Sequence, residues 1–189
     1  MHYSQYYPID VLNGLGTRNV LFVSGCAHHC EDCYNKATWS FNNGSLFTDE
    51  LLDKIIMDLK DPRIKRRGLT ISGGEPLHHR NLPEVKRVIE RVRVECPDKD
   101  IWLWTGFKLE ELSPAQKEVT DMVNVLIDGK YVKDLRDPAL TWRGSSNQRV
   151  LDVPGGYKEI PDVQLRKHEN KDLIGLRCES CSMEFPTNC

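Results

Sequence analysis

Short β-rich runs alternate with amphipathic helical stretches from residue 19 to residue 130, and this alternation limits the folds open to the chain. Strands and helices that alternate in this way are typical of βα units on a parallel sheet, which makes the fold α/β. The sequence predicts strands at 19–24, 68–72, 100–105 and 123–127. Four such units are too few to close the eight-fold barrel, which takes about 250 residues. The sheet is therefore predicted to be open, either doubly wound or a partial barrel.

Three helices are predicted between these strands. Thr48 can cap a helix whose first turn is acidic and whose leucines and isoleucines between 51 and 59 share one face. Pro83 suits the first position of a second helix, which carries a valine and isoleucine stripe from 85 to 92. Ser113 begins a Ser-Pro-Ala-Gln capping box, which predicts a short third helix.

The closing part of the chain carries less pattern. After residue 130 the periodicity fades, which predicts a loop-rich segment, and from residue 157 onward the sequence is highly charged and then cysteine-rich. The predicted division is a domain of βα units over residues 1–156 and an appended tail over residues 157–189. The role of the tail does not follow from its residues.

Composition excludes several classes of protein. A chain of 189 residues can bury a sizeable core, and a net charge of −2 gives no general attraction for nucleic-acid phosphates. No apolar run approaches the ~18 residues of a membrane span, and the first residues lack the pattern of a secretory signal. We therefore expect a cytoplasmic protein that binds neither nucleic acid nor membrane. In a reducing compartment, its seven cysteines are more often metal ligands than disulfides.

Three cysteines, Cys26, Cys30 and Cys33, lie in the loop that follows the first predicted strand. Iron–sulfur clusters are held by Cys thiolates, and a four-iron cubane normally takes four of them. Three ligands leave one iron open to a substrate or a second cofactor. The competing interpretation is zinc, but structural zinc is almost always closed by four ligands, and catalytic zinc favours histidine. The spacing therefore favours a reactive iron–sulfur cluster.

Ligands bind at the carboxyl ends of parallel strands, and we call this end of the sheet the rim. The cysteine loop follows a strand and so lies on the rim, and two further motifs are predicted there. Gly73, Gly74 and Glu75 follow the second strand; glycines let a ligand approach the backbone, and the carboxylate suits an ammonium group. Asp128 and Lys130 follow the fourth strand. Lys130 could hold a ligand's carboxylate, and Asp128 its sugar hydroxyls or its sulfonium region. The alternative for this pair is a turn with solvated charges.

Other residues with reactive or aromatic side chains are expected to have structural roles. His28 and His29 lie between the first two cysteines and are expected to be solvated loop residues. Trp102 and Trp104 alternate on the third strand and are expected to pack on the sheet. Cys96 is expected to be a small, buried thiol.

The tail offers a second candidate metal site. Cys178 and Cys181 form half of a zinc ribbon, and Cys189 could be a further ligand. A complete ribbon has two such pairs, and the second pair is missing. Two interpretations stay open, zinc at Cys178 and Cys181 or a flexible tail without metal.

Taken together, the motifs resemble a known family. A C-x3-C-x2-C loop followed by Gly-Gly-Glu is the pattern of radical S-adenosylmethionine enzymes. The stretches Trp-Leu-Trp-Thr-Gly at 102–106 and Trp-Arg-Gly-Ser-Ser-Asn-Gln-Arg at 142–149 resemble the activating proteins of anaerobic, class III ribonucleoside-triphosphate reductases. The resemblance spans about residues 5–150.

The resemblance implies a fold, two cofactors and a reaction. The fold is an incomplete, open barrel of βα units, and a [4Fe-4S] cluster on the three cysteines binds S-adenosylmethionine at its open iron. An electron from a flavodoxin-like donor cleaves the S–C5′ bond, and the resulting radical removes a hydrogen from a glycine of the reductase. The wider superfamily commonly has an aromatic residue where this chain has Asp32, and Tyr34 follows the third cysteine instead. Asp32, Cys33 and Tyr34 are therefore expected beside the cofactor.

Three alternative functions stay open. Two keep the cofactor and change the substrate: an activase for pyruvate formate-lyase, or a deazapurine-synthase-like enzyme that acts on a small heterocycle. The third is a non-catalytic metal-binding or electron-transfer module.

Overall fold

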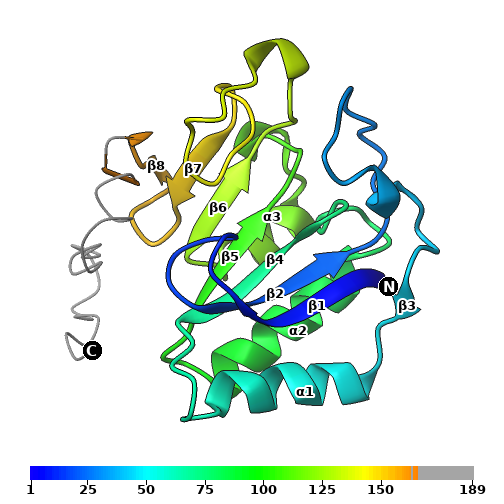
Figure 1. Ribbon diagram of the computed structural model, residues 1–189, viewed down its shortest axis with the longest axis vertical. Coiled ribbons are helices and arrows are strands. Elements are labelled where there is room, and N and C mark those ends of the chain that lie inside the picture. Colours follow the sequence, from blue (N-terminus) through cyan, green and yellow to red (C-terminus); the bar gives the residue numbers. More distant parts are fainter. Residues whose placement is uncertain (163, 166–189) are drawn as a thin grey trace.

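The computed structural model describes residues 1–162, 164 and 165 of the chain. Eight strands form one mixed sheet in the order β3-β1-β2-β4-β5-β6-β7-β8 (Figure 1). The strands are β1 (His2–Asp10), β2 (Arg18–Val23), β3 (Ser45–Leu46), β4 (Gly68–Gly73), β5 (Asp100–Trp104), β6 (Val125–Asp128), β7 (Arg149–Asp152) and β8 (Lys158–Glu159). The helices are α1 (Asp49–Lys60), α2 (Leu82–Glu95) and α3 (Pro114–Thr120), with short 3-10 turns η1 (Lys36–Trp39), η2 (Leu109–Glu111) and η3 (Lys133–Leu135).

Four parallel strands, β2, β4, β5 and β6, form the centre of the sheet, and the outer strands are antiparallel to their neighbours. The four central strands are those that the sequence predicts. In register, Val20 lies opposite Thr70, and Thr70 lies opposite Trp102. Because the strands are parallel, the loops that follow them emerge at one end of the sheet. The loop after β2 and the segment after β6 both rise there (Figure 1).

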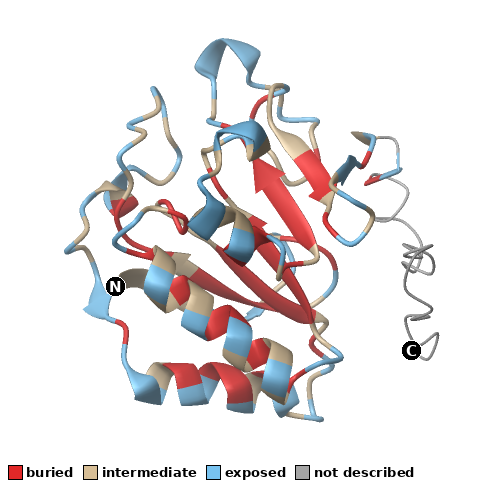
Figure 2. Cartoon of the chain, turned by 180° about the vertical axis from the view of Figure 1, so that it is seen from behind, coloured by how far each residue is buried: buried red, intermediate tan, exposed pale blue. Residues whose placement is uncertain are grey.

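The helices α1, α2 and α3 cover one face of the sheet. Their buried residues turn toward the strands and their exposed residues away from them (Figure 2). A doubly wound sheet would carry helices on both faces. Here the three described helices share one face, so the arrangement differs from a doubly wound sheet. The predicted α/β class is confirmed.

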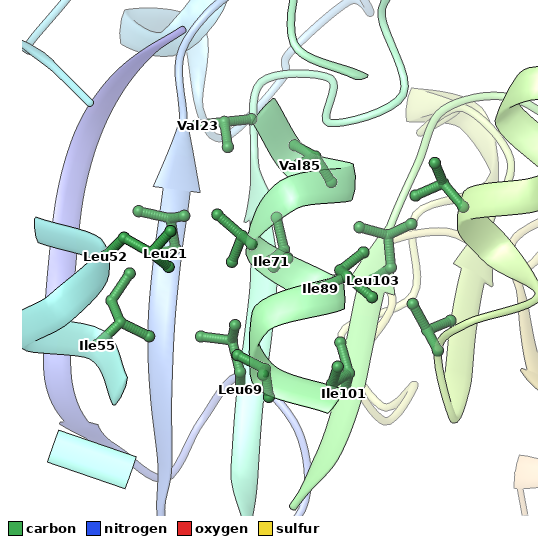
Figure 3. Packing of buried hydrophobic residues seen from close by; sticks show 14 of the residues in the cluster. Leu21, Val23, Leu52, Ile55, Leu69, Ile71, Val85, Ile89, Ile101 and Leu103 are labelled. Atoms are coloured by element: carbon green, nitrogen blue, oxygen red, sulfur yellow. The ribbon is translucent and has the colours of Figure 1, made fainter. Parts of the chain in front are cut away.

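The main core lies between this face and the helices (Figure 3). Leu21, Ile71 and Leu103 point from adjacent strands toward Ile55 of α1 and Ile89 of α2, and all five are fully buried. Each such side chain stabilises the fold by about 1.5–3 kcal/mol relative to exposure. This core fixes the ends of the central strands, on which the candidate site is built.

A smaller cluster covers the other face of the sheet. Trp102, Val125, Ile127 and Val150 form its strand side, as the expectation for Trp102 requires. The loop before β2 contributes Leu15, and the end of the described chain contributes Ile160 and Leu165. The first residues of the predicted tail therefore pack on the sheet, and the division at residue 156 stays a prediction.

Two helix starts follow their predicted caps. The hydroxyl of Thr48 accepts from the backbone N–H of Leu51 at 3.4 Å, and Ser113 and Gln116 form a reciprocal capping box. The second helix begins at Leu82, one residue before the predicted proline, and Asn81 precedes it. No helix in the described part of the chain is long and apolar enough to cross a membrane.

The outer strands were not predicted, and the expectation of a loop-rich segment after residue 130 is wrong for β7 and β8. Both are short, at four and two residues, so neither carries enough alternation to stand out from a loop. The strand β1 is nine residues long, but its half-buried pattern includes Pro8 and several polar residues. β1 is a strand because it pairs with β2, and β7 because it pairs with β6. Such pairing cannot be seen in the sequence of a single segment.

Candidate functional site

The three cysteines lie in the loop after β2, at the carboxyl end of the sheet. Cys26, Cys30 and Cys33 are free thiols of intermediate exposure. The loop is fastened at its start, because the N–H of Gly25 donates to the carbonyl of Thr38 at 2.7 Å. The three cysteines therefore lie at the carboxyl ends of the parallel strands, where the order of elements predicts them.

Backbone N–H groups point at two of the sulfur atoms. Burial raises the pKa of the Cys26 thiol, and the N–H groups of His28 and His29 act in the opposite direction by donating to its sulfur. Burial also raises the pKa of the Cys30 thiol, and the N–H of Tyr131 donates to that sulfur. Donors of this kind stabilise sulfur that carries negative charge, as it does in a metal–thiolate bond.

The loop contains two residues in the left-handed backbone region, His29 with φ 49° and Asp32 with φ 54°. Residues other than glycine adopt this region at a cost and are enriched near binding sites. His29 and Asp32 place both left-handed turns between Cys26 and Cys33, within the segment that carries the three cysteines.

The segment after β6 lies against the cysteine loop. The ammonium group of Lys133 is 2.8 Å from a carboxylate oxygen of Glu31 and 3.0 Å from one of Asp32. The hydrogen bond to Lys133 lowers the pKa of Asp32 below its usual range. Exposed ion pairs contribute little to stability. Their contribution here is to hold two loops of the rim together.

The glycines of the Gly-Gly-Glu motif are required by close packing of two strand ends. Gly73 has φ 106°, and a Cβ there would lie 2.6 Å from the carbonyl oxygen of Val23. A Cβ on Gly74 would lie 2.6 Å from the carbonyl oxygen of Gly25, at the start of the cysteine loop. The N–H of Glu75 donates to that same carbonyl at 2.8 Å. The motif therefore positions the cysteine loop directly.

Glu75 is only 1% exposed, and four donors surround its carboxylate. One oxygen accepts from the N–H of Leu77 and the hydroxyl of Thr105, both at 2.8 Å. The other accepts from the N–H of Gly106 at 2.7 Å and from Nε2 of His28 at 2.8 Å. An ionised carboxylate has about four acceptor positions. A ligand's ammonium group could reach Glu75 only by displacing one of these donors.

The expectation that His28 is a solvated loop residue is wrong. Its side chain is 9% exposed, and its ring lies edge-on to that of Phe107 with centroids 4.7 Å apart. Sequence reasoning missed this role because its partner Glu75 lies 47 residues further along the chain. His29 is exposed, as expected, with its ring edge-on to Trp39.

Asp128 is fully buried and held by two neighbours. One oxygen accepts from the N–H of Leu109 at 2.8 Å, and Arg149 donates to both oxygens, with its Nε at 2.9 Å from Oδ1. Arg149 also reaches Glu110 at 2.9 and 3.0 Å. The solvated turn suggested as an alternative does not apply to Asp128, whereas Lys130 is exposed. Arg149 lies in a predicted motif, but its pairing with Asp128 was not anticipated.

The segment at 142–149 folds back on the end of β6. The side-chain carbonyl of Gln148 accepts from the N–H of Gly144 at 2.9 Å, and its amide donates to the carbonyl of Gly129 at 2.9 Å. The amide of Asn147 donates to the carbonyl of Lys130 at 2.8 Å. The polar residues of this segment therefore shape the backbone on both sides of Lys130.

The remaining predicted residues are dispersed. Tyr34 is 99% exposed, and Asp32 is exposed beside Lys133. Cys178 and Cys181 lie outside the described residues. Among residues 1–162, 164 and 165, no three His, Cys, Asp or Glu side chains gather as the ligands of a single metal ion would.

The chain is similar to several known proteins. Residues 12–151 match the family model of a 4Fe-4S single cluster domain. The anaerobic ribonucleoside-triphosphate reductase-activating protein of Escherichia coli K12 is 59% identical over 150 residues, which are 79% of this chain and 97% of that protein. The protein of the same name from Salmonella typhimurium LT2 is 60% identical over the same shares. That of Enterobacteria phage T4 is 47% identical over 150 residues, 79% of this chain and 93% of its own.

Most of this chain therefore matches almost the whole length of these relatives, and the matched part contains the cysteine loop, the glycine motif and the end of β6. The chain belongs to the family of anaerobic ribonucleoside-triphosphate reductase-activating proteins and contains a 4Fe-4S single cluster domain.

Proposed function

We propose that this protein is a radical S-adenosylmethionine activase that generates a glycyl radical on an anaerobic ribonucleoside-triphosphate reductase. The observation that carries the proposal is the loop with Cys26, Cys30 and Cys33 at the carboxyl end of the sheet, in a chain of this family. Three thiolates satisfy three irons of a cubane and leave the fourth open.

The residues of the loop suit such a cluster. In a cubane each of the three cysteines would bind a different iron, so a cluster would not require the three sulfurs to converge on one point. Cys26 and Cys30 already receive backbone N–H groups, which compensate the charge that cluster sulfur carries. When bound on Cys26, Cys30 and Cys33, the cluster would supply one-electron reductive cleavage of the S–C5′ bond of S-adenosylmethionine, the radical chemistry that hydrogen removal from a glycine of the reductase needs.

The chain's own residues bind, orient and shield. Lys130 is exposed and near enough to favour the charged form of Cys30, so it is placed to hold the ligand's carboxylate. Tyr34 offers an exposed aromatic ring and Asp32 an exposed carboxylate, on the two residues that flank Cys33 in the sequence. Gly73 and Gly74 shape the adjoining rim. Asp128 acts on this site through Leu109 and Arg149, which it holds in place.

The proposal extends to fold and partners. We take the sheet, with all described helices on one face, as the incomplete barrel of radical S-adenosylmethionine enzymes. The proposed domain is residues 1–156, and β8 continues its sheet into the predicted tail. The reductase is the protein substrate, and a flavodoxin-like protein donates the electron. A large partner would close the exposed rim and exclude water from the radical.

The test is electron paramagnetic resonance on an anaerobic mixture of this protein, S-adenosylmethionine, a reductant and a candidate reductase. We expect a glycyl signal with the wild-type protein and with Cys96→Ser, whose thiol is buried at the end of α2, away from the rim. Cys26→Ser should give none. Cleavage of S-adenosylmethionine without a glycyl signal would favour a different substrate, and no cleavage at all would leave an electron-transfer module.

A further inference from the structure

This inference rests on the proposed function and concerns a residue inside the cysteine loop. We propose that His28 is a positioning residue that fastens the loop to the carboxyl ends of β4 and β5, and that Glu75 is its anchor. The juxtaposition that carries the proposal is a hydrogen bond of 2.8 Å between Nε2 of His28 and a carboxylate oxygen of Glu75.

The direction of this hydrogen bond follows from its surroundings. An ionised carboxylate only accepts hydrogen bonds, so Nε2 of His28 carries the hydrogen. The two side chains are 9% and 1% exposed, so water offers little competition for either partner. The bond is therefore of the charge-assisted kind, which is about twice as strong as a neutral one.

The ring of His28 packs directly against the backbone of Gly106, where a larger residue would not fit. A Cβ on Gly106 would lie 2.5 Å from Nε2 of His28 and would clash with the ring. Phe107 closes the seat with its ring edge-on to the imidazole. The His28 ring is therefore held by packing as well as by its hydrogen bond.

Because the His28 ring is fixed, the backbone of the cysteine loop on either side of it is restrained as well. His28 is two residues from both Cys26 and Cys30, so a fixed His28 side chain restrains the backbone between these two cysteines. Through one residue, the loop after β2 is joined to Glu75 after β4 and to Gly106 after β5. Three strand ends then move as one unit.

Glu75 is rigid because its other partners cannot leave easily. They are the backbone N–H groups of Leu77 and Gly106 and the hydroxyl of Thr105, which is 5% exposed. His28 is the one side-chain ring among the four donors. An ammonium group that bound Glu75 directly would have to displace His28. The positioning role requires instead that His28 stays when the ligand binds.

Three variants separate these roles. His28→Gln keeps a donor near the position of Nε2, His28→Phe keeps the ring without the hydrogen bond, and His28→Ala keeps neither. His79→Gln is the matched control, because His79 is an exposed histidine on the same rim. Circular dichroism of each variant establishes that it folds; if His28→Ala fails to fold, the Gln and Phe pair carries the comparison.

The first measurement uses the metal-free full chain. Hydrogen exchange of the amides at 25–33 should be about tenfold faster or more in His28→Ala and His28→Phe, as the loss of a charge-assisted hydrogen bond requires. His28→Gln should restore most of the protection, and His79→Gln should match the wild type. Equal protection in all four variants, or failure of Gln to restore it, would overturn the proposal.

The second measurement uses anaerobically reconstituted protein and S-adenosylmethionine. The His28→Ala variant should lose iron to a chelator faster than the wild type does. The affinity of this variant for S-adenosylmethionine should be equal to that of the wild type or weaker. Tighter binding would show that the ligand normally displaces His28, and would also overturn the proposal. If the wild-type protein takes up no iron, the proposed function fails, and hydrogen exchange still judges the role of His28 by itself.

Discussion

Single residues decide whether the cysteine loop can close onto the sheet. Gly25, directly before Cys26, has φ 99°, and a Cβ there would run into the ring of Phe41. Its carbonyl and N–H hold Glu75 and Thr38, so the residue is fixed from both sides. The position therefore demands glycine both for its conformation and for space.

Replacing this glycine should be costly. For Gly25→Ala we expect about 1–2 kcal/mol from the left-handed conformation and about 1–3 kcal/mol more from overpacking. Gly156→Ala is the control, because Gly156 has φ 80° but nothing within 4 Å of its built Cβ, so only the first cost applies. Urea unfolding of the metal-free proteins measures both. Equal losses would mean that Phe41 moves aside freely.

The ion pairs of Arg149 make one residue sensitive to acid. Arg149 lowers the pKa of Glu110 to about 2, below its usual value near 4.5. A depressed pKa in the folded state adds stability above the unfolded pKa, and that stability is lost as the pH falls from about 4.5 toward 2. The difference in urea midpoint between wild type and Glu110→Gln should therefore shrink between about pH 6 and pH 3.5. A difference that stays constant with pH would show that the pair does not form in solution.

Roles at the residue scale were the least predictable from sequence. The motifs identify Gly73, Gly74, Glu75 and Asp128 as candidate site residues, but they do not show which contacts require these residue types. Glu75 is held by groups up to 47 residues away, and Asp128 by Arg149, 21 residues away. A sequence shows which residues can donate or accept; it does not show which distant partner fills each position.

At the scale of helices and strands, prediction succeeded where the signal was local. The cap at Thr48, the box at Ser113 and the apolar faces of α1 and α2 lie within single segments. The central strands are continuous apolar runs, as strands buried on both faces are. The outer strands β1, β3, β7 and β8 depend on pairing between segments, and these were missed.

The apolar face of α2 gives a direct test of the core. Ile89 is fully buried against the sheet (Figure 3). Val94, on the same helix, is 80% exposed. Ile89→Ala should lower the free energy of unfolding by about 2–5 kcal/mol. Val94→Ala should change it by no more than about 0.5 kcal/mol. Similar effects of the two substitutions in urea unfolding would contradict the packing of α2 on the sheet.

On the scale of the whole molecule, the parallel sheet gathers motifs that are far apart in the sequence. The cysteine loop, the glycine motif and the residues after β5 and β6 meet at one end, as the order of elements predicts. The class of fold and the placement of the rim therefore followed from the sequence. The covering of the second face of the sheet did not, because it depends on Leu15 in the loop before β2 and on Ile160 and Leu165.

The chain also contains a second group of cysteines, near its end. Cys178 and Cys181 lie outside the described residues and are the natural comparison for the loop cysteines. If the account is right, the catalytic metal depends on one group of cysteines only.

The most direct test is iron and sulfide analysis of anaerobically reconstituted protein, together with assay of S-adenosylmethionine cleavage under reducing conditions. We expect the wild type and the double variant Cys178→Ala, Cys181→Ala to hold about four irons per chain, as a cubane requires, and to release 5′-deoxyadenosine. Cys26→Ala should lose both the cubane and the cleavage. A wild-type protein that binds only zinc, or a Cys26→Ala variant that keeps its iron and its activity, would contradict the account.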